Sequence, residues 1–176
     1  MRMITMVTAG LLIFSSVKCM EAKSEATHPY PGNPNADIWV LAGQSNMQGA
    51  GLITKKYKPL PHVKVFNMDN TWIPAVPPTH RIYDAVSEVY KNLVLQNNPG
   101  LTDQDWQNAV EANKKSPLGG VGPDLSFAET IVKHTGNDVG LIPCALGATS
   151  MAQWDPAGLS LGDKSLYGNM INRIKM

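Results

Sequence analysis

Three short apolar segments, separated by polar or glycine-rich stretches, dominate the hydrophobic pattern of the chain. They cover residues 37–42, 63–68 and 138–145, and each is bounded by turn-forming residues. Continuous apolar runs of this length are typical of strands buried on both faces of a parallel sheet. We therefore predict three such strands, the first of which stops at Gly43.

Apolar residues recur at helical spacing between and after these segments. Four helices are predicted, over residues 82–95, 103–113, 123–136 and 164–175. Thr102 or Asp103 would cap the second helix, and Pro74 with the later Pro77-Pro78 pair is expected to break any element there. The alternation of strands and helices predicts an α/β fold with right-handed crossovers. A helix covering a parallel sheet normally leads to another strand, so we expect C-terminal strands to be missing from the sheet.

Composition narrows the class of protein without identifying it. The 176 residues are enough for one domain, and the net charge of +1 gives no electrostatic argument for binding nucleic acid or an anionic membrane. The two cysteines, Cys19 and Cys144, provide no disulfide framework. Cys144 lies in an apolar run and is predicted to be a small core residue.

The N-terminal residues have the pattern of an export signal. Arg2 precedes a mostly apolar stretch over residues 7–17, which is too short to anchor the chain in a bilayer. We predict a signal peptide over residues 1–22, a flexible lead-in over residues 23–36 and a single domain over residues 37–176. The protein would then be secreted or periplasmic; the alternative is a buried N-terminal helix.

Ser45 is the candidate for nucleophilic chemistry, because it directly follows the first predicted strand. Active sites of open parallel sheets form beyond the carboxyl ends of the strands. Gln44 and Asn46 flank this serine with amide groups, and Gly43 permits a tight turn. Met47 occupies the last place of the G-x-S-x-G elbow, which disfavours the α/β-hydrolase fold. The alternative is that Ser45 only caps a turn or a helix.

A second loop of small residues, Gly147-Ala-Thr-Ser150, follows the third predicted strand at the matching place. Its N–H groups could face Ser45, although an ordinary turn explains the loop equally well. Trp154 is either a wall of a sugar site or a packing residue. Gly119-Gly-Val-Gly122 does not indicate a nucleotide site, because it does not follow the first strand as G-x-G-x-x-G and no Walker motif occurs.

Four ordered segments between residues 37 and 173 resemble the sialate O-acetylesterase domain family, a group of SGNH-hydrolase-like carbohydrate esterases. The segments are Ile38-Trp-Val-Leu-Ala-Gly-Gln-Ser-Asn-Met47, Gly120-Val-Gly-Pro123 with Phe127-Ala128, Gly140-Leu-Ile-Pro-Cys-Ala145 with Gly147-Ala-Thr-Ser-Met-Ala-Gln-Trp154, and Ser165-Leu-Tyr167. A lone G-x-S would be a weak signal, whereas four segments in the family's order are specific.

The resemblance implies a three-layer α/β/α, flavodoxin-like fold and the hydrolysis of acetyl esters on carbohydrates through a serine acyl-enzyme. It implies no metal and no other cofactor. Ser45 matches the nucleophile, and its own N–H with an N–H of the Gly147 loop would match the oxyanion hole. Gly147 and Thr149 agree with the family pattern. Ala148 stands where the family usually has a second glycine, which matters if the backbone φ there is positive.

The resemblance also implies a catalytic base that this chain does not show. Family members carry a late Asp-x-x-His, and no such motif occurs in the 176 residues. His62 and His80 lie in loops with no acid placed to suggest a dyad, His28 lies in the lead-in, and His134 ends a helix. Two interpretations remain open: a carbohydrate O-acetylesterase whose activity in this chain is weak or absent, and a non-catalytic secreted carbohydrate-binding relative. The partner in both is an acetylated carbohydrate, sialate or polysaccharide.

Overall fold

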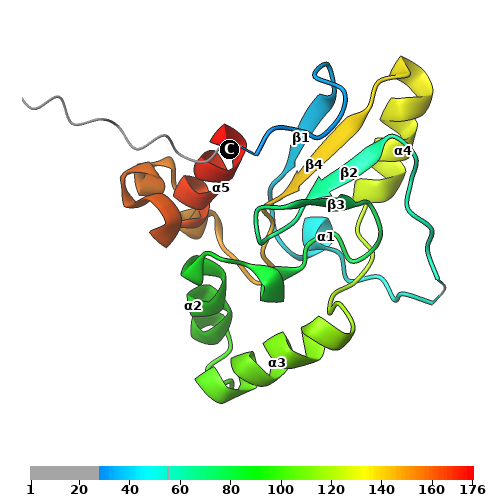
Figure 1. Ribbon diagram of the computed structural model, residues 1–176. Helices are drawn as coiled ribbons and strands as arrows, with labels where there is room; N and C mark the ends of the chain where they lie inside the picture. The colour runs from blue at the N-terminus through cyan, green and yellow to red at the C-terminus, as the bar shows by residue number, and fades with distance from the viewer. Residues whose placement is uncertain (1–27, 55) are drawn as a thin grey trace, which may run out of the picture.

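The computed structural model describes residues 28–54 and 56–176, and the predicted signal peptide over residues 1–22 lies outside them. The described chain forms one four-stranded sheet (Figure 1). Its strands, in spatial order, are β1 (Asp37–Leu41), β4 (Val139–Pro143), β2 (Val63–Phe66) and β3 (Trp72–Pro74). β1, β4 and β2 are parallel and β3 is antiparallel to β2, so the three predicted strands and their parallel pairing are confirmed.

Helices and 3₁₀ segments connect and cover these strands. The helices are α1 (Ser45–Gln48), α2 (Glu88–Asn97), α3 (Asp103–Lys115), α4 (Asp124–Thr135) and α5 (Leu166–Lys175), and the 3₁₀ segments are η1 (Ile82–Asp84), η2 (Met151–Trp154) and η3 (Pro156–Lys164). α3 begins with a capping box in which the Asp105 N–H donates to Thr102 Oγ1 at 3.2 Å. Gly136 ends α4 with a left-handed φ of 72°, as its position predicts.

The sheet separates two hydrophobic layers, which confirms the expected α/β/α arrangement. Val65 and Leu141 of the central strands face α4 and pack against Leu125 and Ile131. The next residues along the strands, Phe66 and Ile142, point to the opposite face, where Met170 of α5 and free, fully buried Cys144 join them. This alternation follows from the two-residue period of a strand. Figure 1 shows α4 and α5 on opposite sides of the sheet.

β1 departs from the prediction that it is buried on both faces. Ile38, Trp39 and Val40 are 45%, 40% and 36% exposed. The reason is the strand order: β4 lies between β1 and β2, so β1 is an edge strand with a neighbour on one side only. Trp39 is partly covered by an edge-on contact with Phe127 of α4, with ring centroids 5.0 Å apart.

Three further details differ from the prediction for local reasons. Pro74 ends an element, as expected, but that element is a short strand, β3, which the hydrophobic pattern does not predict; Pro74 is tolerated there because the edge of the sheet requires no amide donor. The helix predicted over residues 82–95 is divided, because Ala85 is extended with ψ of 127° and Ser87 caps α2. Pro123 is the N-cap of α4 rather than its first helical residue.

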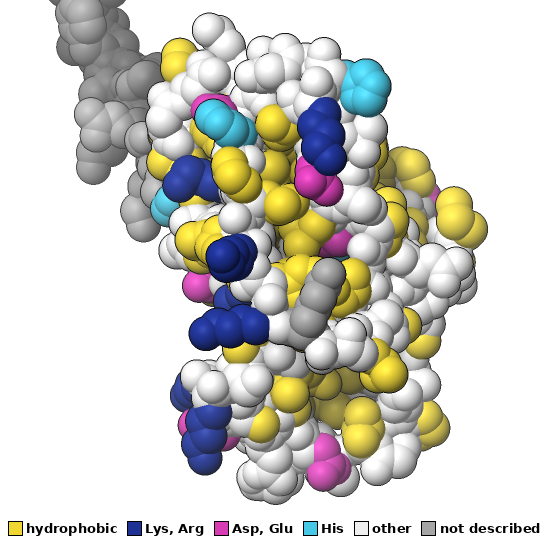
Figure 2. Space-filling model, turned by 90° about the vertical axis from the view of Figure 1, so that its right-hand side faces the viewer, with side chains coloured by type: hydrophobic (Ala, Val, Ile, Leu, Met, Phe, Trp, Pro, Cys, Tyr) yellow, Lys and Arg dark blue, Asp and Glu magenta, His cyan; other side chains and the backbone are white. Residues whose placement is uncertain are grey.

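Residues 28–36, predicted as part of the lead-in, contact the antiparallel edge of the sheet. The Tyr30 and Trp72 rings meet edge to face at 5.0 Å, and Trp72 Nε1 donates to the His28 carbonyl at 2.8 Å. On the face that carries α4, Lys and Arg side chains are interspersed with Asp, Glu and exposed apolar residues (Figure 2). None of the helices in the described ranges has the length and apolar character needed to cross a membrane.

Candidate active site at the carboxyl edge of the sheet

The turn over residues 43–48 carries Ser45, the candidate nucleophile, and is called the nucleophile turn below. This turn and the Gly147 loop, residues 147–150, follow the neighbouring strands β1 and β4 at the edge of the sheet that the carboxyl ends of the strands form. Gly43, with a φ of 140°, turns the chain from β1 into α1, and Ser45 is the exposed first residue of that helix. The N–H of Cys144 donates to the Leu41 carbonyl at 2.9 Å, and the N–H of Leu146 donates to the Gly43 carbonyl at 3.1 Å. These bonds continue the β1–β4 pairing past the ends of the strands and bring the two loops together.

Ser45 and Gly147 approach each other across this edge. A Cβ placed on Gly147 would lie 3.7 Å from Ser45 Cβ and 3.0 Å from Gln48 Oε1. The Gly147 N–H donates to Gln48 Oε1 at 2.5 Å. Sequence reasoning missed Gln48, although it lies three residues after Ser45 and therefore on the same face of α1.

Ala148 has the positive backbone angle that a glycine would adopt without strain. Its φ is 59°, in the left-handed region, and its carbonyl accepts a hydrogen bond from Asn97 Nδ2 at 2.9 Å. A Cβ in this region costs about 1–2 kcal/mol. The strained residue therefore directly follows Gly147, whose N–H is the candidate oxyanion donor.

Replacing Ala148 by glycine is expected to raise the free energy of unfolding by about 1 kcal/mol, because relief of left-handed strain exceeds the extra entropy of an unfolded glycine. Urea denaturation followed by circular dichroism measures this. Ala152, in η2, has no positive φ. Ala152→Gly is therefore the matched control and should lower stability. A loss of stability in both variants would contradict the assignment of strain.

A pocket of about 510 Å³ adjoins the nucleophile turn. It is lined by Ala42, Gly43, Gln44, Thr149, Ser150, Met151 and Trp154. Trp154 Nε1 donates to Thr149 Oγ1 at 3.1 Å, and that hydroxyl donates to the Leu146 carbonyl at 2.6 Å. The Trp154 ring also packs against the buried cluster around Phe66. Trp154 is thus both a pocket wall and a packing residue, while Asn46 is exposed and makes no side-chain hydrogen bond within the described ranges.

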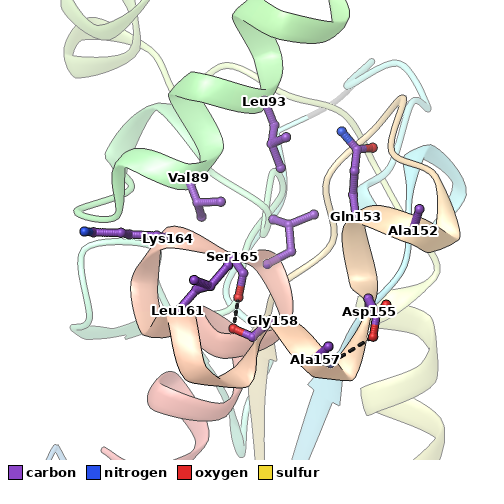
Figure 3. Close-up of a pocket in the computed structure, with 11 residues that line it drawn as sticks. Val89, Leu93, Ala152, Gln153, Asp155, Ala157, Gly158, Leu161, Lys164 and Ser165 are labelled. Atoms are coloured by element: carbon purple, nitrogen blue, oxygen red, sulfur yellow. Dashed lines mark hydrogen bonds between the residues drawn. The ribbon is translucent and has the colours of Figure 1, made fainter.

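A neighbouring pocket of about 380 Å³ lies between α2 and η3 (Figure 3). Val89 and Leu93 of α2 line it together with Leu161 of η3. Ser165 Oγ donates to the Gly158 carbonyl at 2.6 Å, which closes the η3 turn beneath it. Ala152 and Gln153 of η2 also line this pocket, and Met151 and Trp154 of η2 line the pocket beside Gln44, so η2 separates the two.

The glycines of Gly119-Gly-Val-Gly122 serve backbone packing behind the nucleophile turn. A Cβ on Gly120 would lie 2.7 Å from the Gly49 carbonyl oxygen, and one on Gly122 would lie 2.9 Å from the Met47 carbonyl oxygen. A backbone bridge between Gly51 and Val121 joins the two segments. Larger side chains would push the segments apart, which explains these glycines without a nucleotide.

The structure corrects the expectation that no acid is paired with a loop histidine. His62 Nδ1 lies 2.8 Å from Asp138 Oδ1. His62 precedes β2 and Asp138 precedes β4, so this pair lies at the amino ends of the parallel strands. The pair is therefore at the edge of the sheet opposite to Ser45.

The other three described histidines also make their contacts away from the Ser45 hydroxyl. His134 Nδ1 lies 2.8 Å from the Thr130 carbonyl at the end of α4, and the His28 ring lies 6.2 Å from that of Phe66. His80 is buried beneath the end of β1, with Nε2 3.4 Å from the Leu41 carbonyl. Across residues 28–54 and 56–176, no histidine makes a hydrogen bond with the Ser45 side chain.

Burial controls the charge of His80 and of its neighbour Asp124. Desolvation lowers the pKa of His80 from 6.5 to about 4, against an opposing contribution from the Leu41 carbonyl. Thr79 Oγ1 lies between the two groups: it donates to Asp124 and is 3.4 Å from His80 Nδ1. Desolvation also raises the pKa of Asp124. His80 is accordingly neutral at pH 7 and belongs to a buried network under the nucleophile turn.

Metal ligands do not gather at this edge. The part of the chain that the structure describes contains no group of three or more His, Cys, Asp or Glu side chains placed to hold a metal ion. What the geometry brings together is a serine hydroxyl, a backbone N–H, an amide side chain and an aromatic-walled pocket.

Comparison with known proteins identifies relatives of this arrangement. A crystal structure of the Arabidopsis thaliana protein AT4G34215 is similar to the fold, with a TM-score of 0.51 and 22% sequence identity over 78% of this chain and 49% of that one. A curated Arabidopsis thaliana relative, the probable carbohydrate esterase At4g34215, is 27% identical over 160 residues, or 87% of this chain and 51% of the relative. The chain thus spans about half the length of the relatives it matches.

The family comparison covers most of the described chain. Residues 35–176 match the model of the carbohydrate esterase, sialic acid-specific acetylesterase family. This range includes the nucleophile turn, the Gly147 loop and both helical layers. The chain belongs to the carbohydrate esterase family of sialic acid-specific acetylesterases.

Proposed function

We propose that the protein removes O-acetyl groups from carbohydrates, with Ser45 as the nucleophile. The approach of Gly147 to Ser45 carries this proposal, since it places a backbone donor beside an exposed serine at the carboxyl edge of the sheet. The curated relative is named a probable carbohydrate esterase, which supports the substrate class. The natural ester would be an acetylated sialate or polysaccharide.

The chemistry would proceed through an acetyl-enzyme. Ser45 Oγ attacks the acetyl carbonyl carbon, and the N–H groups of Ser45 and Gly147 donate to the oxygen that becomes negative. The bond between the acetyl carbon and the sugar oxygen breaks, and the sugar oxygen receives the proton that a base removed from the Ser45 hydroxyl. Water then hydrolyses the acetyl-serine, which releases acetate and restores the hydroxyl. Gln44, Thr149 and Trp154 line the adjoining pocket and would contact the sugar.

Activation of Ser45 requires a base that the described residues do not place beside it. His80 is buried with a lowered pKa, and His62 is paired with Asp138 at the far edge of the sheet. A serine hydroxyl without a base is a weak nucleophile. We therefore propose that the base comes from outside the described residues, and that a base added in solution replaces it in part.

Added imidazole is expected to raise the rate at which p-nitrophenyl acetate acetylates Ser45 by about tenfold, which is less than a positioned general base contributes, because the free base is not held beside the hydroxyl. Imidazole also attacks p-nitrophenyl acetate itself and forms N-acetylimidazole, so the increase at Ser45 must exceed the increase at Ser126, an exposed serine on α4. Mass spectrometry of the digested protein measures the acetyl group on the peptide that carries Ser45. Ser45→Ala should show no such adduct with or without imidazole. Release of acetate from acetylated xylan, dependent on Ser45, then tests the natural class of substrate.

The second candidate function, a non-catalytic carbohydrate-binding relative, is favoured by the absence of a described histidine beside Ser45. It predicts that the chain and its Ser45→Ala variant bind acetylated xylan equally, and that imidazole produces no Ser45 adduct. Acetyl groups found only on surface lysines would likewise show that Ser45 is not acetylated. Absence of the Ser45 adduct would contradict the proposed esterase. Equal binding of acetylated xylan agrees with both functions, because a serine nucleophile need not contribute to substrate binding.

A further inference from the structure

The Gly147 N–H, which the proposed esterase needs for the substrate oxygen, is already occupied. It donates to the side-chain oxygen of Gln48 at 2.5 Å. That oxygen also lies 3.0 Å from the place of a Gly147 Cβ, which itself would be 3.7 Å from Ser45 Cβ. An amide oxygen of the protein therefore already occupies the backbone donor that lies beside Ser45.

The acceptor is chemically similar to the substrate group. The oxygen of a carboxamide and the carbonyl oxygen of an acetyl ester both accept a hydrogen bond in the plane of an sp² carbon. We propose that Gln48 is an internal ligand of the Gly147 N–H, and that the carbonyl oxygen of an acetyl group must displace it. Gln48 is then a specificity-determining residue of the site, an assignment that rests on the proposed function.

The consequence is selection among ligands. A ligand that displaces Gln48 breaks the hydrogen bond between the Gly147 N–H and the Gln48 oxygen. If the ligand carries a carbonyl-type oxygen, it accepts a new hydrogen bond from this N–H; if it does not, the half-buried N–H is left without a partner. Ligands without a carbonyl-type oxygen are therefore disfavoured. Removal of the Gln48 amide should strengthen binding of an oxygen ligand, because no internal bond has to be broken first.

Acetate, the product of the proposed reaction, is the probe. We expect Gln48→Ala and Gln48→Met to bind acetate about fivefold more tightly than the unaltered chain, the factor that corresponds to one ordinary net hydrogen bond. The Met side chain keeps the length of Gln without its amide oxygen. The ¹H and ¹⁵N shifts of the Gly147 amide, followed through an acetate titration, report the binding locally. Gln104→Ala, an exposed glutamine on α3, is the matched control.

In the unaltered chain without acetate, the Gly147 amide proton should be shifted downfield by its short bond, and it should move upfield in Gln48→Met. Equal acetate affinities in the unaltered chain and both Gln48 variants would overturn the proposal, as would a Gly147 amide that acetate does not shift in any of them. If the Gln48 variants bind acetate more tightly as expected, but imidazole produces no acetyl adduct on Ser45, the esterase function would be contradicted and the role of Gln48 would stand.

Discussion

Replacing Arg173 by methionine is expected to lower the free energy of unfolding by about 3 kcal/mol. Arg173 is only 3% exposed, and it joins α5 to the end of β2. Its guanidinium donates to the carbonyls of Phe66 at 2.7 Å and Asn67 at 3.1 Å. It also donates to Asn70 Oδ1 at 2.7 Å and lies 5.1 Å from the centre of the Phe66 ring.

The size of the effect follows from what the substitution leaves behind. Methionine fills much of the volume but donates no hydrogen bond, so buried carbonyls of Phe66 and Asn67 lose a charged donor. Urea denaturation at pH 7 measures the change. Lys175→Met, at an exposed position of the same helix, should change stability by no more than about 0.5 kcal/mol. Equal midpoints for the two variants would show that the guanidinium contributes little.

Acidification is expected to destabilise the protein through His80 by roughly 2–3 kcal/mol between pH 7 and pH 4.5. The pKa of His80 is lowered from 6.5 to about 4 by burial. As the pH falls below 6.5, His80 becomes protonated in the unfolded chain, whereas in the folded chain it stays neutral until the pH approaches 4. Stability contributed by the neutral ring is therefore complete above pH 7 and is lost progressively between those two pKa values.

His80→Gln removes this titration while retaining a hydrogen-bonding side chain. Its free energy of unfolding should fall less between pH 7 and pH 4.5 than that of the unaltered chain, by the same 2–3 kcal/mol. Asp124 acts in the opposite direction in both proteins, because its raised pKa makes the folded state bind a proton more readily as the pH falls. His134→Gln, an exposed position on α4, is the control. Parallel pH profiles for His80→Gln and the unaltered chain would show that burial does not restrain protonation of His80.

The local pattern determined those features that depend on neighbours in the sequence. The apolar runs predicted β2 and β4, Thr102 and Gly136 marked helix ends, and Gly43 before Ser45 predicted the tight turn that the structure contains. Each of these depends on side-chain period, a capping hydroxyl or a glycine φ, which operate within a few residues. The sequence also placed Gly147 at the same edge of the sheet as Ser45, because both residues follow a parallel strand. It left open whether Trp154 lines a site or packs, and in the structure it does both.

Only the tertiary structure decided what depends on the order of the strands. The position of β4 between β1 and β2 leaves the apolar residues of β1 exposed, and it sets the Gly147 loop directly beside the nucleophile turn. The same packing pairs His62 with Asp138 at the amino ends of the strands, opposite to Ser45. It also buries His80 under Leu41 and brings the Gln48 amide to the Gly147 N–H. These contacts join residues far apart in the chain through backbone geometry, and hydrophobic periodicity carries no information about which strand becomes the neighbour of which.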